Sequence, residues 1–277
     1  FPTRRSSDLV ILAYKNRTET MAACMTRIRA AAKVPVDTAI TYAGRLDPMA
    51  EGLIIFLCGD MRYFKEQFLH VPKTYTARFF LGYTTDTYDI LGIPHVFADE
   101  QLLPVKELTI NTIETFQPVG TFTQVFPKFS SRRVLGKPLF YHALNGLHVP
   151  EQTHMVSITS YGLLHKKVIS SDVLLQSITN DIKKVDGAFR QSESISVWNS
   201  LGLQHKKEII EYSIQIECSA GFYVRQWVHD LGLFLSTGAV TSGIIRDTIG
   251  VFTMSMLNGE SYRIFNHSDQ EIRDLTS

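Results

Sequence analysis

The chain has 277 residues, 44% hydrophobic and 20% charged, a composition typical of a folded globular protein and not of a disordered one. Its formal net charge is +1, so any attraction to a polyanion has to come from local basic surfaces. Three widely separated cysteines favour neither a disulfide framework nor a zinc site, and no apolar run approaches the roughly 20 residues that span a bilayer. We therefore expect a cytoplasmic protein that does not contact membranes.

The chain opens on FPTRRSSDL, whose composition has no continuity with the rest of the chain, and we expect residues 1–9 to be a non-native leader. The segment TMAACMTRIRAAAK, residues 20–33, is rich in helix-favouring side chains, and Pro35 ends the predicted helix. The tight turn TYAGRLDPMAEG, residues 41–52, comes next. It runs directly into an apolar stretch, residues 52–59, which predicts a buried strand.

Asp60 is a suitable N-cap for a helix over residues 61–69. Residues 74–83 predict a strand that ends in the polar loop TTDTYDILG, residues 84–92, and residues 104–117 predict a helix. Residues 124–146 form a stretch broken by proline and glycine. Basic side chains alternate there with aromatic ones: Lys128, Arg132, Arg133 and Lys137 with Phe126, Phe129, Phe140 and Tyr141.

Basic groups neutralise phosphates and aromatic faces accept unpaired bases, so this mixture is typical of RNA recognition outside duplexes. A solvated loop with an aromatic anchor has the same composition, and both interpretations stay open. Further along, residues 171–188 predict an amphipathic helix. Within residues 209–219, apolar and polar side chains alternate from Ile210 to Cys218, as in a strand with one buried face. Residues 222–235 predict another helix. Interleaved strands and helices indicate one mixed core that carries insertions.

Two charged residues are candidates for chemistry. An aspartate before a proline is most often a turn former, but Asp47 lies between two apolar segments, where rigid elements commonly carry catalytic groups. Arg225 lies among apolar side chains, and a buried guanidinium needs a carboxylate partner. Asp47 is one possible partner among 27 acidic residues, and the pairing would keep its carboxyl ionised.

The stretch AGRLDPMAEGLIIFLCGD, residues 43–60, resembles the catalytic motif of the tRNA pseudouridine synthase B family. Residues 73–92, residues 216–232 and, more weakly, residues 244–250 resemble the next three blocks of that family, in the same order. Four ordered blocks are far more specific than one short motif. The resemblance implies an α+β fold, with a mixed, largely antiparallel central sheet flanked by helices and a thumb-like insertion.

The resemblance also implies the activity, which is isomerisation of a specific uridine to pseudouridine in RNA, most simply uridine 55 in the T-loop of tRNA. Asp47 then acts at the ribose, Tyr75 stacks on the flipped base, and Arg225 pairs with the aspartate. Tyr75 has an alternative role as an ordinary strand aromatic. The expected substrate contacts are Tyr42, Gly44, Arg45, Leu46, Lys73, Ile244, Arg246, Lys128, Arg132 and Arg133. Lys73 could equally serve the structure.

The same resemblance implies no metal and no coenzyme, since the isomerisation is redox-neutral. The expected partner is the T-arm stem-loop of tRNA, bound by a monomer without an obligatory protein partner. Residues 10–265 form the expected catalytic domain, with the thumb-like RNA-binding insertion at 124–155 and an extra insertion at 166–206. Residues 266–277 form a tail in place of a full RNA-binding PUA domain. The extra insertion either adds grip on RNA or covers the core, and amphipathic helices more commonly cover.

Two departures from the family pattern affect the expected substrate contacts. Tyr42 stands where the family has a histidine that helps order the flipped RNA loop, and Ile245 replaces one of a pair of arginines. They motivate one alternative, an RNA-binding or tRNA-folding factor of the same fold without catalysis. A second alternative is a hydrolase of glycosidic bonds that uses Asp47 with a second acid such as Glu51.

Overall fold

The computed structural model describes residues 8–97, 108–201, 207–266 and 269–276. It divides into two compact units, the first formed by Phe1–Tyr75 with Ile245–Ser277 and the second by Thr76–Ile244. The sequence had indicated a single core. No linker in the sequence marks the division between the units. Both boundaries fall inside strands, β4 (Lys73–Leu81) and β13 (Ala239–Ile249).

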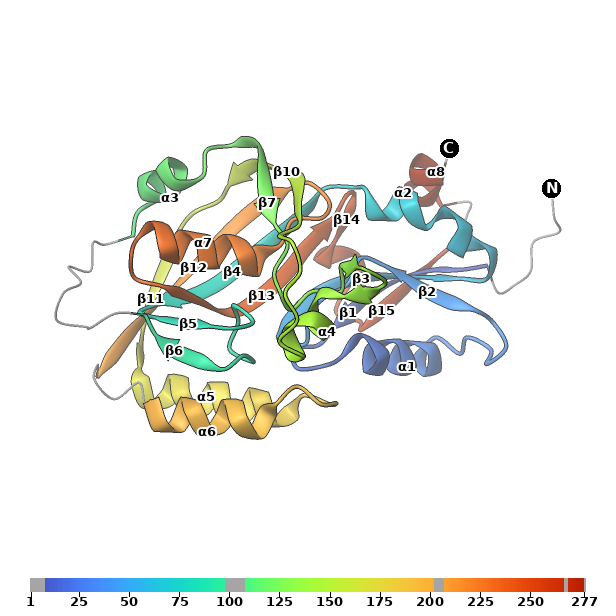
Figure 1. Ribbon diagram of the computed structural model, residues 1–277. Helices are drawn as coiled ribbons and strands as arrows, with labels where there is room; N and C mark the ends of the chain where they lie inside the picture. The colour runs from blue at the N-terminus through green and yellow to red at the C-terminus, as the bar shows by residue number, and fades with distance from the viewer. Residues whose placement is uncertain (1–7, 98–107, 202–206, 267–268, 277) are drawn as a thin grey trace. The chain divides into compact units, whose positions relative to one another are not determined.

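The first unit combines the two ends of the chain (Figure 1). Its elements are β1 (Val10–Lys15), α1 (Met21–Ala31), β2 (Ile40–Ala43), β3 (Ala50–Cys58), the 3₁₀ helix η1 (Gly59–Phe64), α2 (Lys65–Leu69), the start of β4, the end of β13, β14 (Phe252–Thr253), the 3₁₀ helix η4 (Met254–Leu257), β15 (Tyr262–Phe265) and α8 (Gln270–Thr276). Strands β15, β1 and β3 are neighbours in that order, and β2 pairs with β3.

Strand β3 is the centre of this unit because both of its faces are covered. Eight of its nine residues are buried, which explains the unbroken apolar run in the sequence. Its side chains share a core with β1, β14 and β15, and Ile272 of α8 is fully buried in the same core. The tail predicted at 266–277 therefore contributes, over its described part, to the packing of the first unit.

The second unit contains β5 (Tyr83–Thr85), β6 (Pro94–Val96), α3 (Ile110–Phe116), β7 (Gly120–Val125), β8 (Arg133–Val134), β9 (Lys137–Pro138), α4 (Leu139–Leu144), β10 (Thr153–Tyr161), β11 (His165–Ser170), α5 (Ser171–Lys184), α6 (Gln191–Leu201), β12 (Glu208–Cys218) and α7 (Val224–Phe234). Strands β4, β12, β10 and β7 are neighbours in that order, and β11 pairs with β12. The pairs β7–β10, β10–β12 and β11–β12 are antiparallel.

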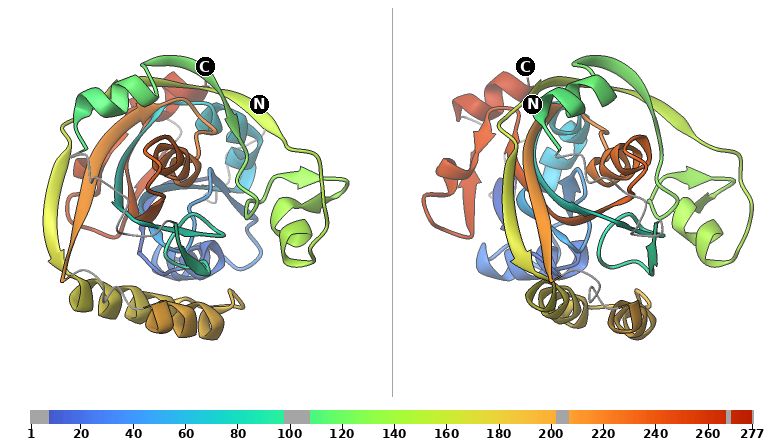
Figure 2. Two further views of the ribbon diagram at one scale, coloured as in Figure 1. Left: turned by 60° about the vertical axis from the view of Figure 1, so that its left-hand side comes forward. Right: turned by 90° about the vertical axis from the view of Figure 1, so that its left-hand side faces the viewer.

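Helix α7 is enclosed on one side by the curved strands of the second unit, and α5 and α6 run side by side in Figures 1 and 2. The alternation in β12 produces the predicted buried face, on which Tyr212, Ile214 and Ile216 are inaccessible to solvent. Helix α7 buries Trp227 and Val228 together with the charged Arg225. The α+β class with a large, mostly antiparallel sheet is confirmed.

Several predicted boundaries were wrong in detail. The helix expected over 61–69 is a 3₁₀ helix followed by five residues of α-helix, and Asp60 lies inside the first turn and is not its N-cap. The amphipathic helix ends at Lys184, and α6 was not predicted as a separate element. The helix expected over 104–117 begins at Ile110, capped by Thr109; residues 104–107 lie outside the described residues, as do 202–206 of the extra insertion.

Candidate active site

Asp47 lies at the start of a tight turn in the first unit. The backbone carbonyl of Asp47 accepts a hydrogen bond from the amide of Ala50 at 3.0 Å, and Pro48 supplies the restricted φ that such a turn favours. The flanking side chains of Leu46 and Met49 are buried, whereas Asp47 is half-buried. The buried side chains of Leu46 and Met49 therefore anchor the turn on both sides of Asp47, which itself is only partly buried.

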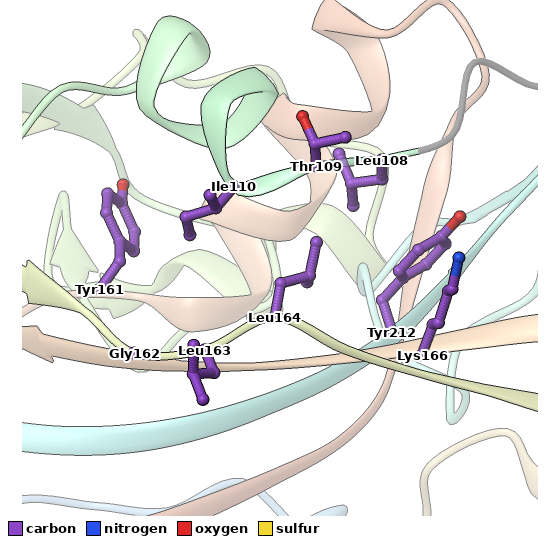
Figure 3. Close-up of a pocket in the computed structure, with 9 residues that line it drawn as sticks. All are labelled: Leu108, Thr109, Ile110, Tyr161, Gly162, Leu163, Leu164, Lys166 and Tyr212. Atoms are coloured by element: carbon purple, nitrogen blue, oxygen red, sulfur yellow. The ribbon is translucent and has the colours of Figure 1, made fainter.

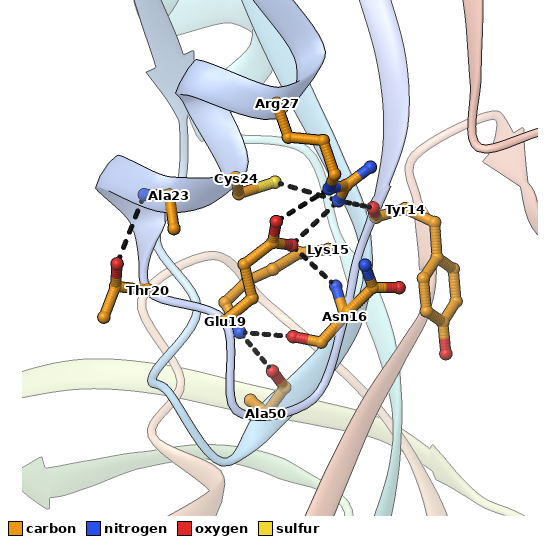
Figure 4. A network of polar contacts seen from close by, with 9 residues as sticks. All are labelled: Tyr14, Lys15, Asn16, Glu19, Thr20, Ala23, Cys24, Arg27 and Ala50. Atoms are coloured by element: carbon orange, nitrogen blue, oxygen red, sulfur yellow. Dashed lines mark hydrogen bonds and ion pairs between the residues drawn. The ribbon is translucent and has the colours of Figure 1, made fainter. Parts of the chain in front are cut away.

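Lys15, the last residue of β1, bonds to the backbone at the end of this turn, where Figure 4 shows it beside Ala50. Its fully buried ammonium donates hydrogen bonds to the carbonyls of Asn16 at 3.0 Å, Pro48 at 3.3 Å and Ala50 at 2.6 Å. Burial lowers the pKa of Lys15 from its ordinary value to about 8, opposed by nearby acidic groups that include Asp47. Lys15 thus fixes the backbone beside the candidate catalytic carboxylate.

A second cation, Arg246, bonds to the backbone of the motif on both sides of Asp47. Arg246 of β13 is 1% exposed, and its guanidinium donates to the carbonyls of Leu53 at 2.7 Å, Arg45 at 3.4 Å and Gly44 at 3.5 Å. Gly44 has a φ of +78°, a left-handed conformation that glycine adopts without strain. This burial favours a supporting role for Arg246 over the RNA contact that the resemblance implied.

Lys73 is also buried, and its ammonium donates to the carbonyls of Leu69 at 2.5 Å and Val71 at 2.6 Å. Of the two roles expected for it, the structural one is favoured. Tyr42 of β2 packs edge-on against Phe56, and the ammonium of Lys65 lies 5.9 Å from the centre of the Tyr42 ring. Tyr42 is half-buried, and its expected contact with the substrate remains a prediction.

Tyr75 and Ile244 are buried on strands β4 and β13, 9% and 6% exposed. Tyr75, like Asp47, belongs to the first unit, and Ile244 belongs to the second. The roles of Tyr75 and Ile244 at a substrate base remain predictions.

Arg225 lies in the first turn of α7, in the second unit, and is 3% exposed. Its guanidinium forms an ion pair with Asp89, with 3.6 Å between Nε and Oδ2, and donates to the carbonyls of Thr87 and Phe129. The prediction that this buried arginine needs a carboxylate partner is confirmed. Because Asp47 belongs to the other unit, its pairing with Arg225 stays a prediction.

Asp89 is the functional candidate that sequence reasoning missed. It is 4% exposed, and its carboxylate accepts hydrogen bonds from the Thr87 hydroxyl at 2.7 Å and the Leu91 amide at 3.1 Å. The loop also bonds to Thr241 of β13 through the backbone of Tyr88 and Ile90. One sequence signal could have identified Asp89. The loop over residues 84–92, which belongs to a block that resembles the family, contains two aspartates, Asp86 and Asp89.

The thumb-like segment at 124–155 carries its basic side chains on the surface. Lys128, Arg132 and Arg133 are exposed, and the Arg132 guanidinium lies 5.0 Å from the centre of the Phe126 ring. Gln124 and Tyr223 exchange two hydrogen bonds that fasten β7 to the start of α7. The segment is thus fixed at its base and exposes cations together with the aromatic side chains of Phe140 and Tyr141, groups that suit RNA binding.

A cavity of about 520 Å³ lies elsewhere in the second unit (Figure 3). It is lined by Leu108, Thr109, Ile110, Tyr161, Gly162, Leu163, Leu164, Lys166 and Tyr212. None of these is a predicted site residue, and we assign no activity to it. Among the described residues, no group of three or more His, Cys, Asp or Glu side chains is placed to hold a metal ion, and no helix has the length and apolarity to cross a membrane.

Comparison with known proteins bears on the motif around Asp47. Residues 33–181 match the model of the TruB family pseudouridylate synthase, N-terminal domain, a region that includes Asp47, Tyr75, Asp89 and the thumb-like segment. This match covers more than half of the chain. The chain belongs to the TruB family.

Curated relatives cover most of the chain. A protein of Blochmanniella floridana named tRNA pseudouridine synthase B is 29% identical over 218 residues, which are 79% of this chain and 68% of that protein. A protein of the same name from Protochlamydia amoebophila (strain UWE25) is 29% identical over 235 residues, 84% of this chain and 72% of that protein. The resemblance stated from the motifs is confirmed.

Among solved structures, the chain is similar to one in a crystal structure of a Cbf5–Nop10–Gar1 complex. The TM-score is 0.50 at 16% identity, over 90% of this chain and 50% of that one. The chain therefore spans about half the length of that structure. At this identity the likeness concerns the fold alone, and it agrees with the TruB-family sheet described above.

Proposed function

We propose that this TruB-family protein isomerises uridine to pseudouridine in tRNA, and that its target is uridine 55 of the T-loop. The observation that carries the proposal is the family match, which encloses an aspartate on a rigidly supported turn. The relatives named tRNA pseudouridine synthase B support tRNA as the substrate. We further propose that the protein acts as a cytoplasmic monomer.

In this proposal the Asp47 carboxylate acts, ionised, at the ribose of the target uridine, so that the uracil detaches, rotates and rejoins through carbon 5. The reaction needs the acid held at one position relative to the sugar, because small displacements of a reacting group cost large factors in rate. Lys15 and Arg246 supply that support through the backbone of the motif. A base has to leave its stack for this chemistry, and the thumb-like segment is the proposed grip on the RNA.

The test is Asp47→Asn assayed on a T-arm stem-loop that carries carbon-5-tritiated uridine. Turnover releases tritium, so we expect the variant to lose release by at least about a thousandfold, as when an essential catalytic group is removed. Binding of the same stem-loop should stay within a factor of about three, since the substitution keeps size and shape. Glu51→Gln is the matched control: its carboxylate accepts a hydrogen bond from the Tyr14 hydroxyl at 3.0 Å, and its loss should leave most turnover.

Three outcomes would contradict the proposal. Undiminished release by the Asp47→Asn variant would remove Asp47 from the chemistry. Intact binding with no release by the unmodified protein, on any tRNA, would favour the RNA-binding or tRNA-folding factor, for which Tyr42 and Ile245 are the motivating residues. Free uracil in place of an isomer of unchanged mass would favour the hydrolase that uses Asp47 with Glu51.

A further inference from the structure

The described part of the extra insertion, from Lys166 to Leu201, is integrated into the second unit. Ser194 and Trp198 of α6 are both fully buried. The Ser194 hydroxyl donates to the carbonyl of Gly92 at 2.8 Å, and the Trp198 indole donates to the carbonyl of Ile90 at 3.0 Å. Both acceptors lie in the loop that carries Asp89. Helix α6 therefore holds this loop through two buried hydrogen bonds.

Aromatic packing secures the same contact. The Trp198 ring lies 6.3 Å from Phe80 and 6.2 Å from Tyr83, measured between ring centres, within the range of favourable aromatic pairs. The expectation that the insertion covers the core is consistent with this packing. Covering the core needs only apolar contacts. The two hydrogen bonds of α6 are both made to the loop that carries Asp89, and they fix the position of that loop.

Arg190 precedes α6 and connects the insertion to two other segments. Its guanidinium pairs with Asp86 at 2.7 Å and lies 4.8 Å from the centre of the Phe129 ring. Its backbone has a φ of +60°, a conformation that costs a side-chain-bearing residue energy and that surrounding contacts have to maintain. Asp86 belongs to the Asp89 loop, and Phe129 belongs to the thumb-like segment.

Two arginines contact Phe129, one at its backbone carbonyl and the other at its ring. Arg225 donates to its carbonyl at 3.3 Å, while Arg190 covers its ring. The two arginines pair in turn with the two aspartates of one loop, Arg225 with Asp89 and Arg190 with Asp86. We call these contacts of Arg190 and Arg225 with Phe129 the clamp. The exposed Lys128 immediately precedes Phe129, so the clamp fixes the base, or root, of the thumb-like segment next to its exposed basic side chains.

We propose that Arg190 is a positioning residue for RNA binding. It connects Phe129, at the base of the thumb-like segment, to Asp86 in the loop that carries Asp89. This rests on the function proposed above. A root that is ordered before RNA arrives reduces the entropy lost on binding, so the clamp acts on affinity. It acts through Phe129 and the thumb, without contacting the reacting atoms.

The first experiment compares Arg190→Ala with the unmodified protein in the tritium-release assay on a T-arm stem-loop. Loss of a partly exposed ion pair and a cation–π contact together corresponds to a KM increase of roughly 5- to 30-fold. We expect that increase with kcat within about threefold and an unchanged Tm. Arg190→Lys, which keeps the charge, should recover part of the KM. The matched control is Lys183→Ala, which removes one exposed charge from the same insertion and should leave KM unchanged.

The second experiment measures amide hydrogen exchange without RNA and does not depend on turnover. In Arg190→Ala we expect faster exchange over residues 126–140 and unchanged exchange over α7. Unchanged exchange overturns the proposal, and if KM nevertheless rises, Arg190 contacts the RNA directly. A lowered Tm and kcat with unchanged KM also overturns it, because Arg190 is then only structural. If the unmodified protein releases no tritium, the proposed function fails, whereas exchange still decides whether Arg190 orders the thumb root.

Discussion

Individual buried charges organise the candidate active site. Lys15 and Arg246, each inaccessible to solvent, both direct their hydrogen bonds to backbone carbonyls in or next to the Asp47 motif. A buried cation is costly unless its donors are satisfied, so these positions tolerate few substitutions. Within the first unit, the motif is thereby set by polar contacts as well as by apolar packing.

The lowered pKa of Lys15 predicts a pH effect. Deprotonation above about pH 8 removes one donor and the charge that faces the acidic groups of Asp47, Glu19 and Glu51 and the thiol of Cys24. We expect tritium release to decline as pH rises through about 8. The stability effect has the opposite sign: between about pH 8 and the ordinary lysine pKa the unfolded chain binds more protons, so the contribution of Lys15 to the free energy of unfolding increases with pH.

A pH profile of kcat and a denaturant titration at pH 7 and pH 9.5 check both parts. Lys15→Arg stays charged throughout and should flatten the alkaline limb, whatever its absolute rate. A profile of the unmodified protein that remains flat to pH 9.5 would show that Lys15 keeps its proton or does not support catalysis.

At the scale of elements, α7 approaches the following strand closely enough to require a glycine. A Cβ added to Gly232 would lie 2.3 Å from the backbone nitrogen of Ala239 and 2.7 Å from its Cβ. The Gly232 carbonyl also accepts hydrogen bonds from the amides of Thr237 and Gly238, both at 3.0 Å. Gly232 lies inside a helix, where glycine is normally unfavourable, and its missing side chain is what allows this close packing.

We therefore predict that Gly232→Ala destabilises the protein, although alanine favours a helix by about 1 kcal/mol. Overpacking against a backbone atom costs about 1–3 kcal/mol, and more where the backbone cannot move, so the steric effect should dominate. Urea titration should show a net loss. Asn199→Ala, at an exposed position of α6, is the control and should be neutral or slightly stabilising. Equal or greater stability of Gly232→Ala would mean that α7 shifts freely.

At the scale of the whole molecule, a net charge of +1 leaves RNA attraction to local surfaces. The exposed Lys128, Arg132 and Arg133 form such a surface on the thumb-like segment. Replacing all three by Gln changes the net charge from +1 to −2. If they contact phosphates, the slope of log K against log salt concentration for the T-arm stem-loop should become shallower by about 2.

The matched control replaces Lys167, Lys183 and Lys184, three exposed lysines of the extra insertion, by Gln. The net charge changes by the same amount, so a slope that stays as in the unmodified protein would locate the contacts on the thumb-like segment. Equal slopes for the two triple variants would instead indicate a diffuse electrostatic attraction.

The sequence by itself determined the motif and three of the strands, β3, β4 and β12. The buried strand β3 was predicted from its apolar run and β12 from its alternation, both of which are local patterns. Gly44, Asp47 and Pro48 specify a turn through their backbone preferences. The family resemblance, confirmed by the TruB match, rested on such short local blocks. What is encoded within a few consecutive residues was therefore predictable.

Only the tertiary structure decided which groups meet across long separations. Nothing local distinguishes Asp89 from 26 other acidic residues as a partner of Arg225, and nothing local shows that Arg246 reaches Gly44 or that Arg190 covers Phe129. The burial of a charge depends on the packing of segments that are remote in the chain. For that reason Arg246 was expected from the sequence to contact RNA, whereas in the structure its guanidinium bonds to backbone carbonyls of the motif.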